Sequence, residues 1–104
     1  MNISYNNTKL EKVLTNERSI KREYTLFHKK LINRMSELRV ANNLEEIPHV
    51  PPPNRHKLSG DYNDCWGIDV SKNFRIVLRP IGEWEASDLR TIQNVEIITV
   101  EDYH

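Results

Sequence analysis

The sequence predicts an α+β fold in which N-terminal helices pack on one face of a small antiparallel sheet of four to five strands. Two observations support this fold class. Between residues 20 and 40, apolar residues recur at intervals of three and four, which is the spacing of one helix face. After the proline-rich segment 48–53, apolar residues alternate with polar ones, as in strands with one buried face.

The first expected elements are a short strand and a short helix. Within residues 2–7, Ile3 and Tyr5 alternate with polar residues, which favours a strand. Thr8 and Glu11 have the spacing of a capping box, in which both side chains bond to free amide groups at the start of a helix. We therefore expect Thr8 to cap a helix at this point.

The longest helix is expected across residues 20–40. Its apolar residues form a continuous stripe of about five turns, which we assign to the core. They are Ile20, Tyr24, Phe27, Leu31, Met35 and Leu38. Basic residues, including Lys29, Lys30 and Arg34, lie between them, so the remaining face of the helix is expected to be positively charged.

The second half of the chain is expected to form the sheet. Pro48 and the run 51–53 exclude regular helix and predict an extended connector. A turn at Lys72 and Asn73 predicts a hairpin. The segment 80–94 is expected to be a long loop. The expected strands are 56–61, 66–71, 74–79 and 95–101.

Length and composition limit the class of protein. The 104 residues leave room for one domain, expected to span 1–104. Hydrophobic content of 38% and charged content of 29% are typical of a globular chain. No apolar run suits a signal peptide or a membrane span, and Cys65 has no cysteine to pair with. We expect a cytoplasmic protein that does not enter a membrane, with Cys65 buried as a small apolar side chain.

The net charge is zero, but its distribution is uneven. Residues 9–40 contain nine Lys or Arg against four Glu, whereas residues 41–104 contain six Lys or Arg against eleven Asp or Glu. The basic half could face a polyanion or an acidic partner. A solvated helix face is the commoner explanation of such a pattern.

Several side chains that can carry protons or a fixed charge lie in the predicted sheet. Asp102, Tyr103 and His104 follow the last predicted strand, and His56 opens the first strand after the prolines. Arg75 lies on the polar face of the predicted hairpin. If these strands pair, the five side chains gather on one sheet. Composition alone favours the alternative, in which they are the solvated end of an ordinary edge strand.

Four short segments occur along the chain in an order that is more specific than any one of them alone. They are Pro53–Asp61, Cys65–Ile68, Asn73–Ile76, and the C-terminal pieces Val95–Ile97 and Asp102–His104. Together they resemble the HigB branch of the RelE/ParE toxin superfamily, whose members are also called plasmid-maintenance killer proteins. The resemblance extends from about residue 50 to the end, and the helical half fits the family in layout.

This resemblance implies a RelE-like fold and a type II toxin that cleaves messenger RNA, typically in the decoding site of the translating ribosome. It implies no cofactor. Its partners would be mRNA, the ribosome and a cognate antitoxin with a helix-turn-helix domain, so DNA would be reached only through the antitoxin. The positions that the family uses in catalysis fall on His56, Arg75, Asp102, Tyr103 and His104. The basic helical half is expected to contact the antitoxin.

The chemistry of these residues suits RNA cleavage without a metal ion. The 2′-hydroxyl must lose a proton, the phosphorane charge must be stabilised, and the leaving 5′-oxygen must gain a proton. An imidazole, with an unperturbed pKa of ~6.5, suits both proton steps. Asp102 or His104 is expected to accept the 2′-proton and His56 to protonate the leaving oxygen. Arg75 would stabilise the phosphorane charge, and Tyr103 would stack on or orient a nucleotide.

Three basic side chains near this group are expected to bind the substrate: Lys57, Lys72 and Arg79. Two other functions stay open. The chain could be a gyrase poison of the same superfamily, which binds without cutting nucleic acid, or an inactive relative that only binds its antitoxin. The imidazoles favour the ribonuclease. A metal site of His56, Asp61 and His104 is imaginable, but no metal-ligand spacing recurs in the sequence.

Overall fold

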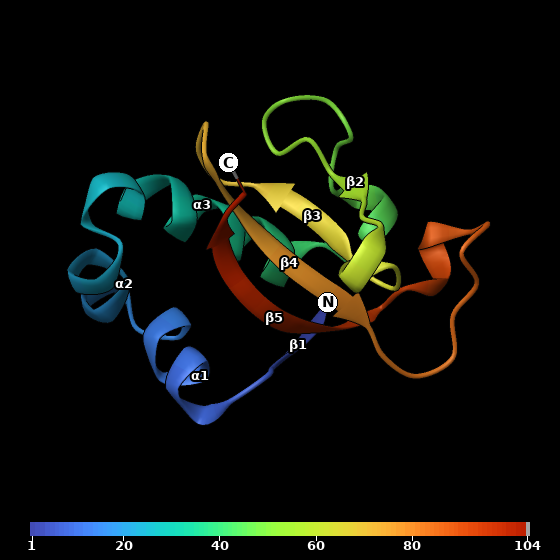
Figure 1. The fold of residues 1–104 in the computed structure, drawn as a ribbon. Helices are drawn as coiled ribbons and strands as arrows, with labels where there is room; N and C mark the ends of the chain where they lie inside the picture. Colours follow the sequence, from blue (N-terminus) through green and yellow to red (C-terminus); the bar gives the residue numbers. More distant parts are fainter. Residues whose placement is uncertain (104) are drawn as a thin grey trace.

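The computed structural model describes residues 1–103 and has the predicted α+β architecture (Figure 1). Its helices are α1 (Thr8–Leu14), α2 (Glu17–Glu23) and α3 (His28–Val40). Its strands are β1 (Asn2–Tyr5), β2 (His56–Lys57), β3 (Trp66–Asp69), β4 (Phe74–Pro80) and β5 (Asn94–Asp102). Short 3-10 helices occur at η1 (Thr25–Phe27), η2 (Leu44–Glu46), η3 (Gly60–Tyr62) and η4 (Leu89–Thr91).

The strands form one sheet in the order β1-β5-β4-β3-β2. The pairs β2–β3, β3–β4 and β4–β5 are antiparallel, whereas β1 runs parallel to β5. The sheet is therefore mixed, and the prediction of an antiparallel sheet is wrong for this edge. Parallel pairing needs a long connection between the two strands. Here that connection contains all three helices and three of the other strands.

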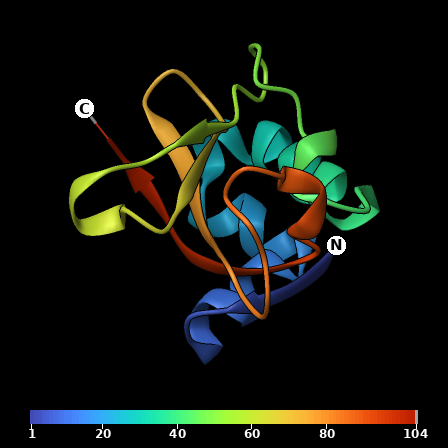
Figure 2. The ribbon, with the colours of Figure 1, turned by 90° about the vertical axis from the view of Figure 1, so that its right-hand side faces the viewer.

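The helices pack on one face of the sheet, as predicted. Figure 2 shows the helices on one side of the sheet and the segment around η3 on the other. The core lies between the helices and the sheet, and each buried Leu, Ile or Met contributes roughly 1.5–3 kcal/mol through removal from water. Its most buried members include Leu14, Leu31, Met35, Leu38, Ile68, Ile76, Leu78 and Ile97.

The helix expected across residues 20–40 is interrupted at η1. The hydroxyl of Thr25 donates to the carbonyl oxygens of Lys21 and Arg22, at 3.0 and 3.3 Å, and so occupies groups at the C-terminal end of α2. Such local bonds compete with helix continuation. The Phe27 ring still reaches the core, because it packs 4.4 Å from the ring of Phe74 on β4. The apolar stripe is therefore confirmed although the helix is not continuous.

Three local expectations need correction. The cap of α1 is Asn7, whose side chain accepts the Leu10 amide at 2.8 Å, so Thr8 is the first helical residue. The strand expected at 56–61 ends at Lys57, because Gly60 adopts a φ of 66° and η3 begins there. Arg34 is buried and pairs with Glu37, so it does not belong to the exposed basic face.

A β-bulge interrupts the pairing of β4 with β5, between Val77 and Leu78. Arg75 and Arg79 are separated by an even number of positions and share one face of β4. Their partners in register, Glu101 and Glu96, are separated by an odd number of positions. Because β5 has one extra residue at the bulge, Glu101 and Glu96 lie on the same face of the sheet, each opposite its own arginine.

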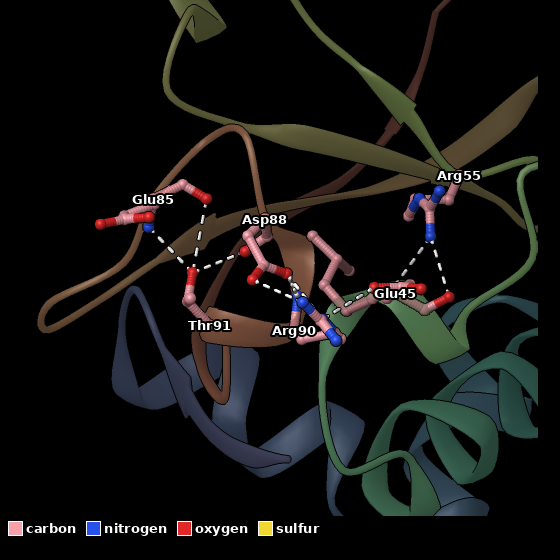
Figure 3. A network of polar contacts seen from close by, with 7 residues as sticks. Glu45, Arg55, Glu85, Asp88, Arg90 and Thr91 are labelled. Carbon is pink, nitrogen blue, oxygen red and sulfur yellow. Dashed lines mark hydrogen bonds and ion pairs between the residues drawn. The ribbon is translucent and has the colours of Figure 1, made fainter.

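The segment between β4 and β5 contains η4 and is tied to η2. Figure 3 shows Arg90 between the carboxylates of Asp88 and Glu45, with contacts of 2.9 and 3.7 Å from its Nε. The Leu44 amide also donates to the Ile92 carbonyl at 3.0 Å. These contacts fix the long segment beside the proline-rich connector, away from the C-terminal end of β5.

Two further sequence expectations concern the core and the membrane. Cys65 is buried, as predicted, and burial raises the pKa of its thiol. Among residues 1–103, no helix combines the length and the apolar character needed to cross a lipid bilayer.

Candidate active site

The candidate site lies on the face of the sheet that the helices leave uncovered. On β4, Ile76 points into the core, so the alternation of the strand places Arg75 and Val77 on the opposite face. On β3, Gly67 and Asp69 pair in register with Val77 and Arg75. The uncovered face therefore carries polar side chains from adjacent strands.

Arg75 is bound by a carboxylate in this structure. Its Nε and Nη2 groups donate to one oxygen of Glu101, at 3.2 and 2.9 Å. The other oxygen of Glu101 accepts the hydroxyl of Tyr62 at 2.8 Å. The side chains of Arg75 and Glu101 are only 16% and 24% exposed, so water screens this pair less than a surface ion pair. The hydrogen bond to Glu101, followed by burial, raises the pKa of Tyr62.

Tyr103 is placed beside Arg75 by contacts of its backbone and its ring. Its amide donates to the Asn73 carbonyl at 3.0 Å, and its ring centroid lies 4.8 Å from the guanidinium carbon of Arg75. Its hydroxyl donates to Asp69 Oδ1 at 3.4 Å. Burial and the charge of Asp69 raise the pKa of Tyr103, so the phenol is protonated at neutral pH and acts as a donor.

His56 is joined to the same network through Asn54 and Asp69. The side-chain amide of Asn54 donates to Asp69 Oδ2 at 2.8 Å, and the Asn54 carbonyl oxygen lies 2.8 Å from His56 Nδ1. A carbonyl oxygen can only accept, so Nδ1 carries the proton in this contact. In the neutral ring, Nε2 is therefore the nitrogen that can accept a proton.

Gly67 provides the space for the His56 ring. The two residues pair in register, and a Cβ atom built on Gly67 would lie 2.9 Å from both Cε1 and Nε2 of His56. Such a distance is too short for carbon in van der Waals contact. The absence of a side chain at position 67 is therefore what lets the imidazole occupy this place on the uncovered face.

The predicted catalytic residues are joined only in part. His56, Arg75 and Tyr103 belong to one network of contacts. Asp102 is exposed and pairs in register with Phe74, so strand alternation directs it to the face opposite Glu101. His104 lies outside the described residues.

The three predicted substrate-binding cations lie at different places. Lys57 is in register with Trp66, and its ammonium lies 5.0 Å from the Trp66 ring, on the opposite face from His56. Arg79 is on the uncovered face but pairs with Glu96 at 2.5 Å, towards the other end of β4. Lys72 is exposed in the turn before β4, next to the residue that binds the Tyr103 amide.

Four members of the network were not identified from the sequence: Asn54, Tyr62, Asp69 and Glu101. A signal existed for Asp69, because it alternates with Ile68 and Val70 and so had to lie on the polar face. No comparable signal existed for Tyr62, which enters the network from η3. Among residues 1–103, no three His, Cys, Asp or Glu side chains are grouped so that they could hold a metal ion.

Comparisons with known proteins give a likeness in structure but none in sequence. No protein-family model and no curated protein matches the sequence. A solved structure of a YoeB/ParE toxin from Agrobacterium tumefaciens matches the fold with a TM-score of 0.58 at 14% sequence identity, over the full length of both chains. This degree of identity establishes the fold alone. The chain therefore has the fold of a YoeB/ParE toxin.

Proposed function

We propose that this chain is the toxin of a type II toxin–antitoxin system and that it is a metal-independent endoribonuclease. The observation that carries the proposal is the network that joins His56, Tyr103 and Arg75 on the uncovered sheet face. A proton carrier and a fixed cation supply two of the three roles that cleavage through the 2′-hydroxyl requires, and an aromatic ring can orient the nucleotide. The YoeB/ParE toxin fold supports the same proposal.

The mechanism follows from the placement of these groups. Strands β2 and β4 flank β3, and His56 lies level with Gly67 and Val77, two positions along β4 from Arg75. We infer that both side chains can reach one phosphodiester on the uncovered face. His56 acts in its doubly protonated form: its Nδ1–H group donates to the Asn54 carbonyl oxygen, and its Nε2 proton passes to the leaving 5′-oxygen. Because strand alternation directs Asp102 to the opposite face, we assign acceptance of the 2′-proton to His104 in preference to Asp102, and Tyr103 stacks on or orients a nucleotide.

Arg75 stabilises the charge that develops on the phosphorane. One oxygen of Glu101 occupies the Nε and Nη2 donors of Arg75, which are donors that a phosphate would use. An incoming phosphate must therefore replace or share this contact. Lys72 adds an exposed positive charge at the turn before β4, whereas Arg79 is paired with Glu96 and Lys57 would contribute only from the strand edge.

The finer assignments belong to the same proposal. We assign the chain, as one domain over residues 1–104, to the HigB branch of the RelE/ParE superfamily. It acts in the cytoplasm on mRNA, within the ribosome. A helix-turn-helix antitoxin neutralises it and connects it to DNA.

The alternative is a gyrase poison, which binds its target without cleaving nucleic acid. One observation favours it: the guanidinium of Arg75 is held by Glu101 and stacked on Tyr103, so it could have a structural role. A chain that only binds its antitoxin is a third possibility.

Expression of the chain without its antitoxin tests the proposal. The ribonuclease predicts new mRNA 5′ ends together with growth arrest and normal plasmid supercoiling. Altered supercoiling without new 5′ ends would instead identify the gyrase poison. If neither new 5′ ends nor altered supercoiling is observed, the chain is an inactive relative that only binds its antitoxin.

A further inference from the structure

We propose that Asp69 and Asn54 are positioning residues for His56 and that Asp69 sets the placement of His56 relative to Tyr103. The inference rests on the proposed ribonuclease function, and it adds two residues that do not touch the reacting atoms. Its basis is that Asp69 contacts both halves of the site, one through each oxygen of its carboxylate.

The contacts of Asp69 extend in two directions across the sheet. Oδ2 accepts the side-chain amide of Asn54 at 2.8 Å, and Oδ1 accepts the Tyr103 hydroxyl at 3.4 Å. Its backbone amide donates to the Pro53 carbonyl at 2.8 Å. Asp69 thus ties the segment that precedes β2 to the residue that follows β5. The first segment leads directly into His56 at the start of β2, and Tyr103 carries the phenol.

Asn54 transmits this placement to the ring of His56. It has a φ of 53°, in the left-handed region, which Asn adopts more readily than most residues. Its side chain is held by Asp69, and its carbonyl oxygen faces His56 Nδ1 at 2.8 Å. Fixing this carbonyl fixes the proton on Nδ1 and keeps Nε2 directed towards the substrate.

A purely structural anchor for the proline-rich connector would also use these contacts. The structural role and the positioning role differ in what substitution of Asn54 or Asp69 does to the His56 imidazole. Loss of a structural anchor lowers stability without changing the position of the ring proton. Loss of a positioning contact changes both the tautomer of His56 and the rate of proton transfer.

The first arm of the test measures the tautomer and needs no cleavage assay. Long-range proton–nitrogen NMR spectra are recorded for the neutral His56 ring, assigned with a His56→Gln variant. We expect the Nδ1-protonated form in the native protein and a shift towards Nε2 protonation in Asn54→Gly and Asp69→Ala. Glycine accepts the φ of residue 54, so Asn54→Gly keeps the backbone and removes only the amide contact.

The second arm measures cleavage of a short RNA. Asn54→Gly and Asp69→Ala should each lower kcat about 10- to 100-fold with little change in KM, because a displacement of about 1 Å has effects of this size. The double variant should be no slower than the slower single variant, since both substitutions break the same contact. Asp69→Asn should retain most of the activity, because its amide oxygen can accept from Asn54. Asp64→Ala, which removes an exposed carboxylate, is the matched control.

The two arms separate the inference from the function on which it rests. If the native protein cleaves no RNA, the proposed function fails, and the NMR arm alone decides the positioning role. An unchanged His56 tautomer in both variants would overturn the inference. So would additive losses in the double variant, or a kcat for Asp69→Asn as low as that for Asp69→Ala.

Discussion

Glu101 binds the guanidinium of Arg75 through two donors, Nε at 3.2 Å and Nη2 at 2.9 Å. This carboxylate occupies the surface that the proposed mechanism assigns to a phosphate. Tyr62 holds Glu101 in place from η3 with a bond of 2.8 Å. The cation that the proposed mechanism requires is therefore present on the uncovered face, where Glu101 neutralises it.

The first prediction is that Glu101→Gln strengthens RNA binding. The substitution keeps the shape of the side chain but removes the negative charge beside Arg75, so an RNA phosphate meets less competition. We expect the Kd for an RNA with 2′-deoxy substitutions, which cannot be cleaved, to fall by up to about tenfold. Fluorescence anisotropy at a fixed salt concentration measures this change.

The matched control for this prediction is Glu96→Gln. It releases Arg79 from an equivalent pair towards the other end of β4, outside the network that contains His56. The Kd should change less in this variant. Unchanged or weaker binding of RNA by the Glu101→Gln protein would show that Arg75 does not meet the phosphate.

The second prediction is that Gly67→Ala inactivates the protein by displacing His56. The added Cβ atom would lie 2.9 Å from Cε1 and Nε2 of the imidazole, so the ring must move. We expect RNA cleavage to fall by about 10- to 100-fold, and the free energy of unfolding to fall by about 1–3 kcal/mol through overpacking.

The His56→Ala background supplies the control for this substitution. There the ring is absent, so the additional Gly67→Ala substitution should cause no further loss of cleavage. Cleavage by Gly67→Ala at the native rate would mean that the position of the His56 ring is irrelevant to the reaction.

The fold could be predicted from the sequence where one residue pattern determines it. The apolar residues of α3 and of the β3–β4 hairpin have clear periods of 3.6 and 2, and they form the core. The parallel pairing of β1 was not predictable, because the direction of pairing depends on the path of the whole intervening chain. The break at η1 was missed because the hydroxyl of Thr25 competes for helix carbonyls within an unbroken apolar stripe.

The sequence indicated which side chains belong to the candidate site, but it did not indicate which of them contact one another. Strand alternation and the position of Arg75 place it on the polar face. Its partner Glu101 depends on the register and on the bulge in β5, which no local pattern reveals. The link from His56 to Asp69 passes through Asn54, a connector residue whose contact with Asp69 no local pattern indicates.

The third prediction concerns alkaline pH. The pKa values of Tyr62 and Tyr103 are raised from 10.0, chiefly by the bond to Glu101 and by burial respectively. The folded state therefore binds both phenolic protons more tightly than the unfolded chain does. This contribution to stability is complete below about pH 10 and is lost as the pH rises through the folded pKa values.

Urea denaturation between about pH 9 and about pH 11 measures this loss. The free energy of unfolding should decrease less steeply with pH in Tyr62→Phe and Tyr103→Phe than in the native protein. Tyrosinate absorbance should also rise at lower pH in urea than in buffer. Identical pH slopes for all three proteins would contradict the assigned contacts.

The fourth prediction concerns the antitoxin. Lys29 and Lys30 are exposed on α3, within the basic half of the chain. Replacing each by Glu should weaken antitoxin binding by about 0.2–1 kcal/mol, mainly through slower association and with a smaller salt dependence. Lys72→Glu makes the same charge change at the turn before β4 and should leave the affinity unchanged. If Lys29→Glu, Lys30→Glu and Lys72→Glu all lowered the antitoxin affinity equally, a specific role for the α3 surface would be excluded.

The most direct test of the central claim uses the purified protein on mRNA-programmed ribosomes in the presence of EDTA. The native protein should cleave and leave 5′-hydroxyl ends, and a 2′-deoxy substitution at the cleaved position should abolish cleavage. His56→Ala and Arg75→Lys should each be at least about 100-fold slower, although both fold and bind antitoxin. Loss of the His56 bond to Asn54 should lower stability by only about 1 kcal/mol. Cleavage by His56→Ala at the native rate would contradict the account.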